Sequence, residues 1–324
     1  MEKRYIGIDL GGTNIKAGVI GEDGTLISKA TVATGFGAQE VIDRMIHAAQ
    51  QAVADGPAQM QDIEAVGIAS PGPLSSEQGI VIRSANLPGW QNVPVRDLIS
   101  RALDRPAFLE NDAKSAAYGE FTVGAGADEK ITNFILITLG TGVGGGIIYH
   151  GRLIRGVSDS AAEIGHMIVN PDGEVCGCGQ RGCLELYASA SRTGKYAQHL
   201  LEAAPNRASS LRALLEAGAT LGSREVAEHA KTGDELAEEV WDRACRYIAL
   251  ACVNAARWLD PQMLAVAGGM AEAGDFLLER VRRHFAALNW KMTETKMEIV
   301  LATLGNDAGM IGAAALARDA SRQR

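Results

Sequence analysis

Asp9-Leu10-Gly11-Gly12-Thr13-Asn14 completes an apolar run, Tyr5–Leu10, that is typical of a buried strand, and continues into a glycine turn. The two glycines allow backbone amides to approach an anion closely, and the carboxylate of Asp9 precedes them. A plain hairpin turn can use the same Gly-Gly pair. The carboxylate favours the other interpretation, which is a turn that binds phosphate.

The elements around this turn alternate between strands and a helix. Residue patterns predict strands at Tyr5–Leu10, Lys16–Gly21 and Leu26–Ala33, then a helix over Gln39–Ala54 and a strand at Ala65–Ala69. Three strands joined by short turns, followed by a helix and a further strand, combine antiparallel hairpins with a parallel crossover. The sequence therefore predicts an α/β lobe with a mixed sheet.

The same order partly repeats after Asn111. A helical stretch near Ala113–Gly124 leads into strands expected at Asn133–Leu139, Gly144–His150 and Leu153–Ile154. The repeat predicts two similar lobes. We expect a small lobe of residues 1–115 plus about 306–324, and a large lobe of residues 116–305.

A second glycine loop, Leu139-Gly140-Thr141-Gly142-Val143-Gly144-Gly145-Gly146, lies between the first two strands of the repeat. It lacks the closing Gly-Lys-Ser/Thr of a P-loop. A strand follows it, whereas a helix follows the glycines of a dinucleotide-binding fingerprint. Two equivalent phosphate turns, one in each lobe, are the interpretation that remains.

The second half of the chain is mainly helical. Periodicity is lost between about Gly156 and Leu184, where an ordered loop is expected. The elements predicted after it are helices over Leu186–Ala204, Val240–Leu259 and Asp307–Arg318, and short strands at Ala265–Ala267 and Ile299–Ala302.

Composition excludes several classes of partner. Lysine and arginine total 31 against 39 aspartates and glutamates, and the net charge of −8 argues against a nucleic-acid surface. Apolar runs stop well short of a membrane span, and the N-terminal residues do not resemble a secretion signal. We therefore expect a cytoplasmic protein that binds neither nucleic acid nor membrane.

A polar pair follows a short apolar strand in Phe108-Leu109-Glu110-Asn111-Asp112-Ala113-Lys114, where a helix begins at once. A helix N-cap alone would explain Asn or Asp at this place. Two turn-rich stretches, Ser70-Pro71-Gly72-Pro73 and Ala85-Asn86-Leu87-Pro88-Gly89-Trp90, belong to the same lobe and have no evident core role. They are either plain loops or loops that close over a polar ligand.

The most specific pattern combines Glu163-Ile164-Gly165-His166 with Cys176-Gly177-Cys178-Gly179-Gln180-Arg181-Gly182-Cys183-Leu184-Glu185. One imidazole and three thiolates suit tetrahedral zinc, and the glycines allow a short loop to fold back on itself. Unrelated buried thiols are the alternative, which the spacing disfavours. The ligands His166, Cys176, Cys178 and Cys183 leave no open position, so the zinc should be structural and should brace a loop of residues 163–185.

The two glycine turns and the duplicated order resemble the two-lobed, actin-like (ribonuclease-H-like) fold that hexokinases share with actin and heat-shock ATPases. The resemblance implies that Asp9 holds the Mg²⁺ of ATP. It assigns the nucleotide and its phosphates to Gly11, Gly12, Thr13, Asn14, Gly140, Thr141, Gly142, Gly268 and Gly269.

The Glu-x-Gly-His and Cys-x-Cys-Gly-x-x-Gly-Cys-x-Glu motifs are similar to the pair that distinguishes the ROK family (repressors, open reading frames and kinases). The resemblance extends from Tyr5 to about Leu316, and within the family it is to bacterial glucose kinases. It assigns the sugar hydroxyls to Asn86, Asn111, Asp112, Glu163, His166 and Glu185, with Gly72 nearby.

The implied reaction is transfer of the γ-phosphoryl group of ATP to the C6 hydroxyl of glucose, with Asp112 as general base. Alternatives are another hexose (fructose, mannose or an N-acetylated hexosamine), polyphosphate as the donor, and a catalytically silent sugar-binding regulator. Intact Asp9 and Asp112 favour an enzyme. A homodimer or homotetramer is expected from the family.

Overall fold

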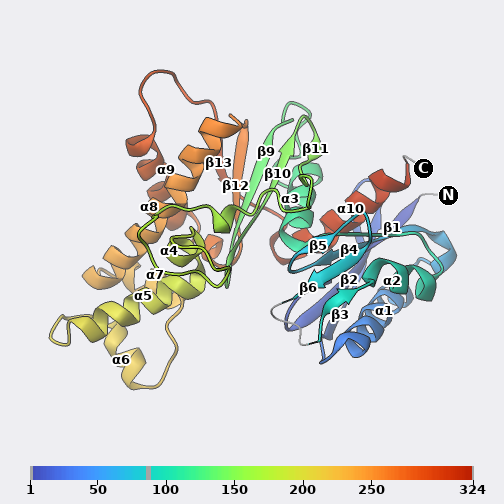
Figure 1. The fold of residues 1–324 in the computed structure, drawn as a ribbon, viewed down its shortest axis with the longest axis horizontal. Coiled ribbons are helices and arrows are strands. Elements are labelled where there is room, and N and C mark those ends of the chain that lie inside the picture. The colour runs from blue at the N-terminus through green and yellow to red at the C-terminus, as the bar shows by residue number, and fades with distance from the viewer. Residues whose placement is uncertain (1–2, 85–88, 323–324) are drawn as a thin grey trace. The chain divides into compact units, whose positions relative to one another are not determined.

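The computed structural model describes residues 3–84 and 89–322 of the 324-residue chain (Figure 1). The chain forms two compact units. Unit 1 consists of Met1–Ile131, Gly146–Ala162 and Thr303–Arg324, and unit 2 consists of Thr132–Gly145 and Glu163–Ala302. Unit 1 includes more of the chain than residues 1–115 and 306–324, because side chains of this unit hold the segment Gly146–Ala162.

The sheet of unit 1 has five strands in the order β3-β2-β1-β4-β8. They are β1 (Arg4–Leu10), β2 (Asn14–Gly21), β3 (Leu26–Ala33), β4 (Ile63–Ser70) and β8 (Ala107–Asn111). The first three are joined as antiparallel hairpins, whereas β4 runs parallel to β1 and β8 runs parallel to β4. The mixed sheet predicted for this part of the chain is confirmed.

Helices cover both faces of this sheet. The helices of unit 1 are α1 (Ala38–Ala54), α2 (Val95–Leu103), α3 (Asp112–Thr122) and α10 (Ala308–Ser321), with short 3₁₀ turns at Met60–Asp62 and Gly305–Asp307. A small antiparallel sheet consists of β5 (Leu74–Ser75), β6 (Ile80–Arg83) and β7 (Gln91–Val93). The sequence analysis did not predict this sheet or α2, because their apolar runs are short.

Alternation along β1 separates its two faces. Ile6, Ile8 and Leu10 are buried in a core that includes residues of α1 and α2. Tyr5 lies in a second core with residues of α10. Because side chains of a strand alternate between faces, Asp9 shares the α10 face with Tyr5 and Gly7.

The second sheet has the order β11-β10-β9-β12-β13, which repeats the order of the first (Figure 1). Its strands are β9 (Phe134–Leu139), β10 (Val143–Tyr149), β11 (Arg152–Leu153), β12 (Met263–Ala267) and β13 (Glu298–Leu301). Here too, β12 is parallel to β9, and β13 is parallel to β12. The predicted duplication of the strand order is therefore present.

Helix α8 (Glu235–Trp258) is central among the helices of unit 2 and contacts four of them. These are α4 (Glu185–Ala188), α5 (Ala190–Ala203), α7 (Ser223–Lys231) and α9 (Asp275–Leu288). The other helical elements of the unit are α6 (Leu211–Glu216) and 3₁₀ turns at Ile164–His166 and Gly269–Ala273. The apolar stripe predicted along α8 is buried at Val240, Ala244 and Ala251.

One stretch that was predicted as a single helix forms two helices. The stretch Leu186–Ala204 was expected as a single helix, but α4 ends and α5 begins around Ser189, whose backbone is extended (φ −78°, ψ 155°). The Ser189 hydroxyl accepts a hydrogen bond from the Arg192 backbone N–H at 3.3 Å. A serine that caps the second helix in this way ends the first one.

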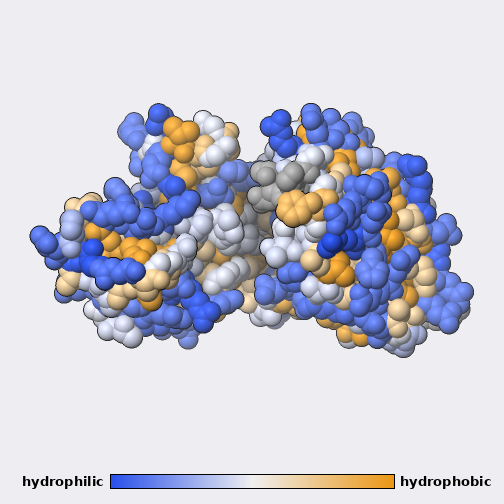
Figure 2. Space-filling model, turned by 90° about the horizontal axis from the view of Figure 1, so that it is seen from below, coloured by the Kyte–Doolittle hydropathy of each residue, from blue (hydrophilic) through white to orange (hydrophobic). Residues whose placement is uncertain are grey.

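The visible surface is mixed in character. Hydrophobic residues lie in small groups among hydrophilic ones on the face drawn in Figure 2. Among the residues that the structure describes, no helix combines the length and the hydropathy that a membrane crossing requires.

Glycines bring α10 into direct contact with the backbone of the first sheet and of α3. A Cβ atom on Gly7 of β1 would lie 1.9 Å from the Met310 carbonyl oxygen, and one on Gly67 of β4 would lie 1.8 Å from that of Ala313. On α10 itself, a Cβ on Gly312 would lie 1.7 Å from the Ser115 carbonyl oxygen. A side chain at Gly7 or Gly67 would force α10 away from the sheet, and one at Gly312 would force it away from α3.

We expect Gly67→Ala to lower the free energy of unfolding by at least about 2 kcal/mol, because the added methyl group overpacks a backbone contact. Gly12→Ala is the matched control, since a Cβ at Gly12 meets nothing within 4 Å. It should stay within about 0.5–1 kcal/mol of the wild type. Equilibrium urea denaturation of both variants is the measurement, and equal stabilities would contradict the packing described here.

Candidate functional site

Polar residues gather where three parallel strands of unit 1 end. In the sheet register, Asp9 of β1 is opposite Ala69 of β4, and Ala69 is opposite Glu110 of β8. Asn111 ends β8, and Asp112 begins α3 directly after it. The carboxyl ends of parallel strands are where ligands bind in open α/β sheets, so this edge is the candidate site of unit 1.

The first glycine turn connects β1 to β2 at this same edge. The Gly11 N–H donates to the Asn14 carbonyl at 3.0 Å, and the buried Thr34 hydroxyl donates to the Gly11 carbonyl at 2.7 Å. Gly12, Thr13 and Asn14 are exposed at its tip. The turn is thus held from one side, and its tip is exposed on the other.

Asp9 has an unusual electrostatic environment. Burial, together with the nearby charges of Asp112 and Asp307, raises the pKa of its carboxyl group to about 6, against the opposing charge of Lys16. Across from it, a Cβ on Gly309 in the first turn of α10 would lie 3.0 Å from the carboxylate. A partly buried carboxylate with two acidic neighbours fits a divalent cation, since Mg²⁺ prefers such oxygen ligands.

Asn111 and Asp112 make different contacts at the start of α3. The Asn111 side-chain oxygen accepts the Lys114 backbone N–H at 3.1 Å, so Asn111, and not Asp112, is the helix cap. One carboxylate oxygen of Asp112 accepts the Ala113 N–H at 2.8 Å. Helix capping therefore does not account for an aspartate at position 112.

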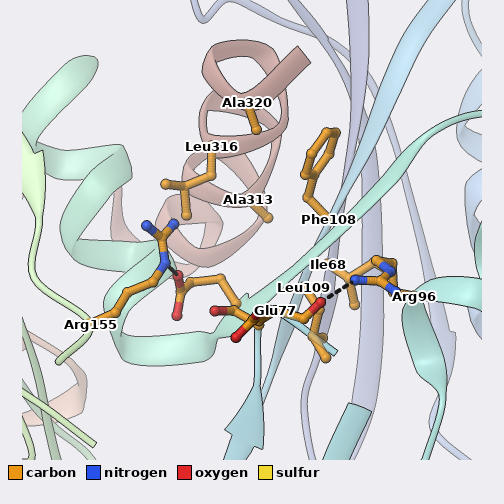
Figure 3. Close-up of a pocket in the computed structure, with 11 residues that line it drawn as sticks. Ile68, Glu77, Arg96, Phe108, Leu109, Arg155, Ala313, Leu316 and Ala320 are labelled. Carbon is orange, nitrogen blue, oxygen red and sulfur yellow. Dashed lines mark hydrogen bonds and ion pairs between the residues drawn. The ribbon is translucent and has the colours of Figure 1, made fainter. Parts of the chain in front are cut away.

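Two residues of the same motif, Glu110 and Lys114, hold the segment Gly146–Ala162 against the rest of unit 1. Buried Glu110 accepts from the Arg155 guanidinium at 2.6 Å, beside a cavity of about 320 Å³ (Figure 3). The fully buried Lys114 ammonium donates to the Asp159 carbonyl oxygen.

Asp159 completes this attachment, because its carboxylate accepts from the Ser76 N–H at 2.9 Å and from the Ser76 hydroxyl at 2.8 Å. The sequence analysis missed these positioning residues. Charged residues that are buried to join two segments have no sequence motif of their own. Lys114, a lysine among small residues in the helical stretch after Asp112, was the one signal that could have been used.

Of the two turn-rich stretches of unit 1, Ser70–Pro73 belongs to the described residues. Gly72 follows β4 with φ +87°, and a Cβ there would lie 2.4 Å from the Arg83 carbonyl oxygen. Only glycine fits this turn without strain. Asn86 lies outside the described residues.

The second glycine loop connects β9 to β10. The Gly140 N–H donates to the Gly142 carbonyl at 3.0 Å, and the Ser191 hydroxyl donates to the Thr141 carbonyl at 2.6 Å. Glu185 was expected only as a sugar ligand, yet its carboxylate also accepts the Val143 N–H at 3.0 Å. This contact links the glycine loop to the cysteine-rich segment.

The third glycine turn begins where β12 ends, next to the end of β9. Thr138 and Ala267 are opposite each other in the parallel register, and a Cβ on Gly268 would lie 2.5 Å from the Leu139 carbonyl oxygen. Gly268 has φ +88°, and both it and Gly269 are exposed. The second and third turns therefore share one edge of the second sheet.

The four predicted metal ligands lie together in unit 2. Ligand atoms of His166, Cys176, Cys178 and Cys183 are all within 4.8 Å of one another. The Cys178 and Cys183 sulfurs are 3.6 Å apart, and the Cys176 sulfur is 3.9 Å from His166 Nδ1. Tetrahedral zinc with ligands at about 2.0–2.3 Å requires separations of roughly 3.5–3.8 Å, so the cluster fits that metal.

The surrounding loop is built to hold these ligands. A 3₁₀ turn, Ile164–His166, follows Glu163 and presents the imidazole, while Gly179 (φ +94°) and Gly182 (φ +69°) bend the chain between thiols. The Gln180 amide lies 3.6 Å from the Cys178 sulfur and 3.7 Å from the Cys183 sulfur. An amide donor at this distance would stabilise the charge of a metal-bound thiolate.

Comparison with known proteins places the chain among sugar-kinase relatives of one family. Residues 5–320 match the ROK family. The chain is 34% identical over 314 residues to a glucokinase of Halalkalibacterium halodurans, covering 96% of this chain and 94% of that protein. It is 30% identical over 318 residues to an N-acetylmannosamine kinase of Haemophilus influenzae, covering 98% and 96%.

The fold agrees as well. A solved ROK family glucokinase from Streptomyces griseus, in complex with glucose and AMPPNP, superposes with a TM-score of 0.81 at 34% identity, covering 98% of this chain and 99% of that one. This likeness confirms the predicted α/β fold class. With a family match over nearly its whole length and relatives of this identity, the chain belongs to the ROK family.

Proposed function

We propose that this protein is a sugar kinase that transfers the γ-phosphoryl group of ATP to the C6 hydroxyl of glucose. The observation that carries the proposal is the pair Asp9 and Asp112, two electrostatically coupled carboxylates at one edge of the sheet beside a glycine turn. A glucokinase relative at 34% identity supports glucose as the acceptor. A solved relative bound to glucose and AMPPNP supports a nucleotide as the donor.

Asp112 is the proposed general base. The C6 oxygen of the sugar attacks the γ-phosphorus, its proton passes to the Asp112 carboxylate, and the bond between the γ-phosphorus and the bridging oxygen of ADP breaks. One Asp112 oxygen accepts the Ala113 N–H at 2.8 Å, a contact that fixes the carboxylate at the start of α3. Asn111 next to it orients the hydroxyl through its amide nitrogen, because its oxygen caps α3.

Asp9 is the proposed residue of the Mg²⁺ site, and the ion, when bound with ATP, neutralises charge on the phosphates. The turn Gly11, Gly12, Thr13 and Asn14 in unit 1 would hold phosphate oxygens. The donors would come from the exposed Gly12, Thr13 and Asn14, because the Gly11 N–H donates to the Asn14 carbonyl. Their counterparts in unit 2 are Gly140, Thr141 and Gly142, with Gly268 and Gly269 toward the adenosine.

Unit 2 contributes the remaining proposed sugar ligands, which are Glu163, His166 and Glu185. His166 belongs to the metal cluster, and Glu163 and Glu185 adjoin it in sequence, so a structural zinc bound there would fix the backbone of all three. Glu185 has one carboxylate oxygen on Val143 and a second one for a sugar hydroxyl. Gly72 and Asn86 complete the proposed set in unit 1.

Two other functions use the same fold. The N-acetylmannosamine kinase relative makes an N-acetylated amino sugar the second candidate substrate. A silent sugar-binding regulator is disfavoured by the intact Asp9 and Asp112. For the assembled enzyme we propose a homodimer or homotetramer, to be measured by light scattering.

Turnover with a substrate panel tests the proposal. Glucose, mannose, fructose and N-acetylmannosamine are each assayed with ATP and with polyphosphate, and product is followed by mass spectrometry. Glucose with ATP should give the highest kcat/KM. A higher value for N-acetylmannosamine would reassign the substrate, and absence of turnover with every pair would favour the regulator.

Asp112→Asn should lower kcat by about 10²–10⁴-fold, because the amide keeps the size of the side chain but cannot accept the proton. The KM for glucose should change much less. Asp104→Asn is the matched control, since Asp104 lies at the end of α2 with a fully exposed side chain, and it should leave kcat unchanged. Near-normal kcat in Asp112→Asn would contradict the assigned role.

Metal analysis should find one zinc ion per chain, and its removal by a chelator should raise the KM for glucose before the protein unfolds. Cys178→Ser should reproduce both the metal loss and the raised KM, because it removes one ligand of the cluster. Cys252→Ala, a core thiol of α8, is the control and should keep its zinc. Folded, active wild type without zinc would refute the assignment.

A further inference from the structure

A second polar cavity lies in unit 2, between α5, α8 and the cysteine-rich loop. It has a volume of about 400 Å³. Helix α5 lines it with Arg192, Lys195, Tyr196 and His199, which follow one another at intervals of three, one and three residues. This spacing places all four on one face of the helix. None of them has a role in the proposed reaction.

Arg243 of α8 lines the same cavity and is held there by aromatic rings. Its guanidinium carbon lies 3.9 Å from the ring centre of Tyr196, 4.9 Å from that of Tyr187 and 5.3 Å from that of Tyr247. Tyr187 and Tyr247 are themselves stacked, with ring centres 4.4 Å apart. Three rings around one guanidinium restrict its motion, so little conformational freedom remains to be lost when it binds a ligand.

The N–H groups of Arg243 are available to a ligand. Within residues 3–84 and 89–322, the guanidinium lies over these three rings and has neither an ion pair nor a hydrogen bond to another side chain. Arginines of this protein usually have carboxylate partners, as Arg280 has in Glu238 at 2.8 Å. A fixed guanidinium without an acid is arranged for an anion that comes from outside the chain.

Charge in the cavity is opposite in sign to that of the whole protein. Arg192, Lys195 and Arg243 are cationic and His199 adds an imidazole, whereas Glu174 is the single acid of the lining and is paired with Arg192. The chain as a whole carries a net charge of −8. A local excess of positive charge in an acidic protein attracts an anion to this place.

We propose that this cavity is a binding site for a small molecule that carries a phosphate group, separate from the phosphate turns. The forked donors of Arg243 contact the phosphate oxygens, Lys195 and Arg192 add charge, and the exposed positions of Lys195 and His199 leave the mouth open to solvent. The site does not depend on the proposed kinase activity.

Calorimetric titration with inorganic phosphate and with glycerol 3-phosphate tests the site, at low ionic strength and without nucleotide, because a nucleotide carries phosphate groups that would compete for the cavity. Both probes should bind the wild type. Arg243→Leu should weaken binding at least about 10-fold, because charge-assisted hydrogen bonds are lost. Lys195→Ala should weaken it about threefold through the loss of an exposed charge.

Two controls keep the result clear. Arg224→Leu removes an exposed arginine of α7 that is paired with Glu228, and it should bind both probes like the wild type. Thermal melting checks that Arg243→Leu is folded, and Lys195→Ala carries the test if it is not. Absence of binding in the wild type, or wild-type affinity in both cavity variants, would overturn the proposal. Binding at the phosphate turns alone would be unchanged in Arg243→Leu, so the dependence on Arg243 identifies the cavity.

Discussion

The contact between α10 and the bare backbone of β1 and β4 is the constraint on which the arrangement of unit 1 depends. Gly7 and Gly67 allow the helix to lie against the sheet, where a methyl group at either position would overlap a carbonyl oxygen. This contact brings Gly309, in the first turn of α10, next to the Asp9 carboxylate. Gly312 allows α3, which begins at Asp112, to pack on the same helix. One set of glycines therefore fixes both the strand end that carries Asp9 and the helix start that carries Asp112.

Two carboxylates held close together at the end of a sheet are costly for the fold, because burial and like charge both oppose ionisation of Asp9. A protein retains such a pair where a cation or a proton acceptor is needed, which agrees with the proposed roles in phosphoryl transfer. In unit 2, Glu185 joins the glycine loop at Val143 to the segment that ends in Cys183. A metal in the cysteine cluster would in this way also stabilise the glycine loop.

Much of this architecture could be predicted from the sequence, since strands such as Tyr5–Leu10 are largely apolar and are followed by a glycine turn. The metal cluster was also predictable, because ligand type and spacing identify it without knowledge of the fold. The small sheet of β5 to β7 was not, because strands of two to four residues have no periodicity. Nor was the attachment of Lys114 to Asp159, which depends on two segments that meet only after folding. The break at Ser189 shows that a single hydroxyl can outweigh helical periodicity.

Asp9 and Asp112 lie within one electrostatic site. The most direct measurement is the titration of the Asp9 carboxyl by ¹³C NMR in Mg²⁺-free protein, repeated in the Asp112→Asn variant. The account predicts a pKa of about 6 for Asp9, which falls when the neighbouring charge is removed. A pKa close to the ordinary value of about 3.9, unaffected by the substitution, would contradict it.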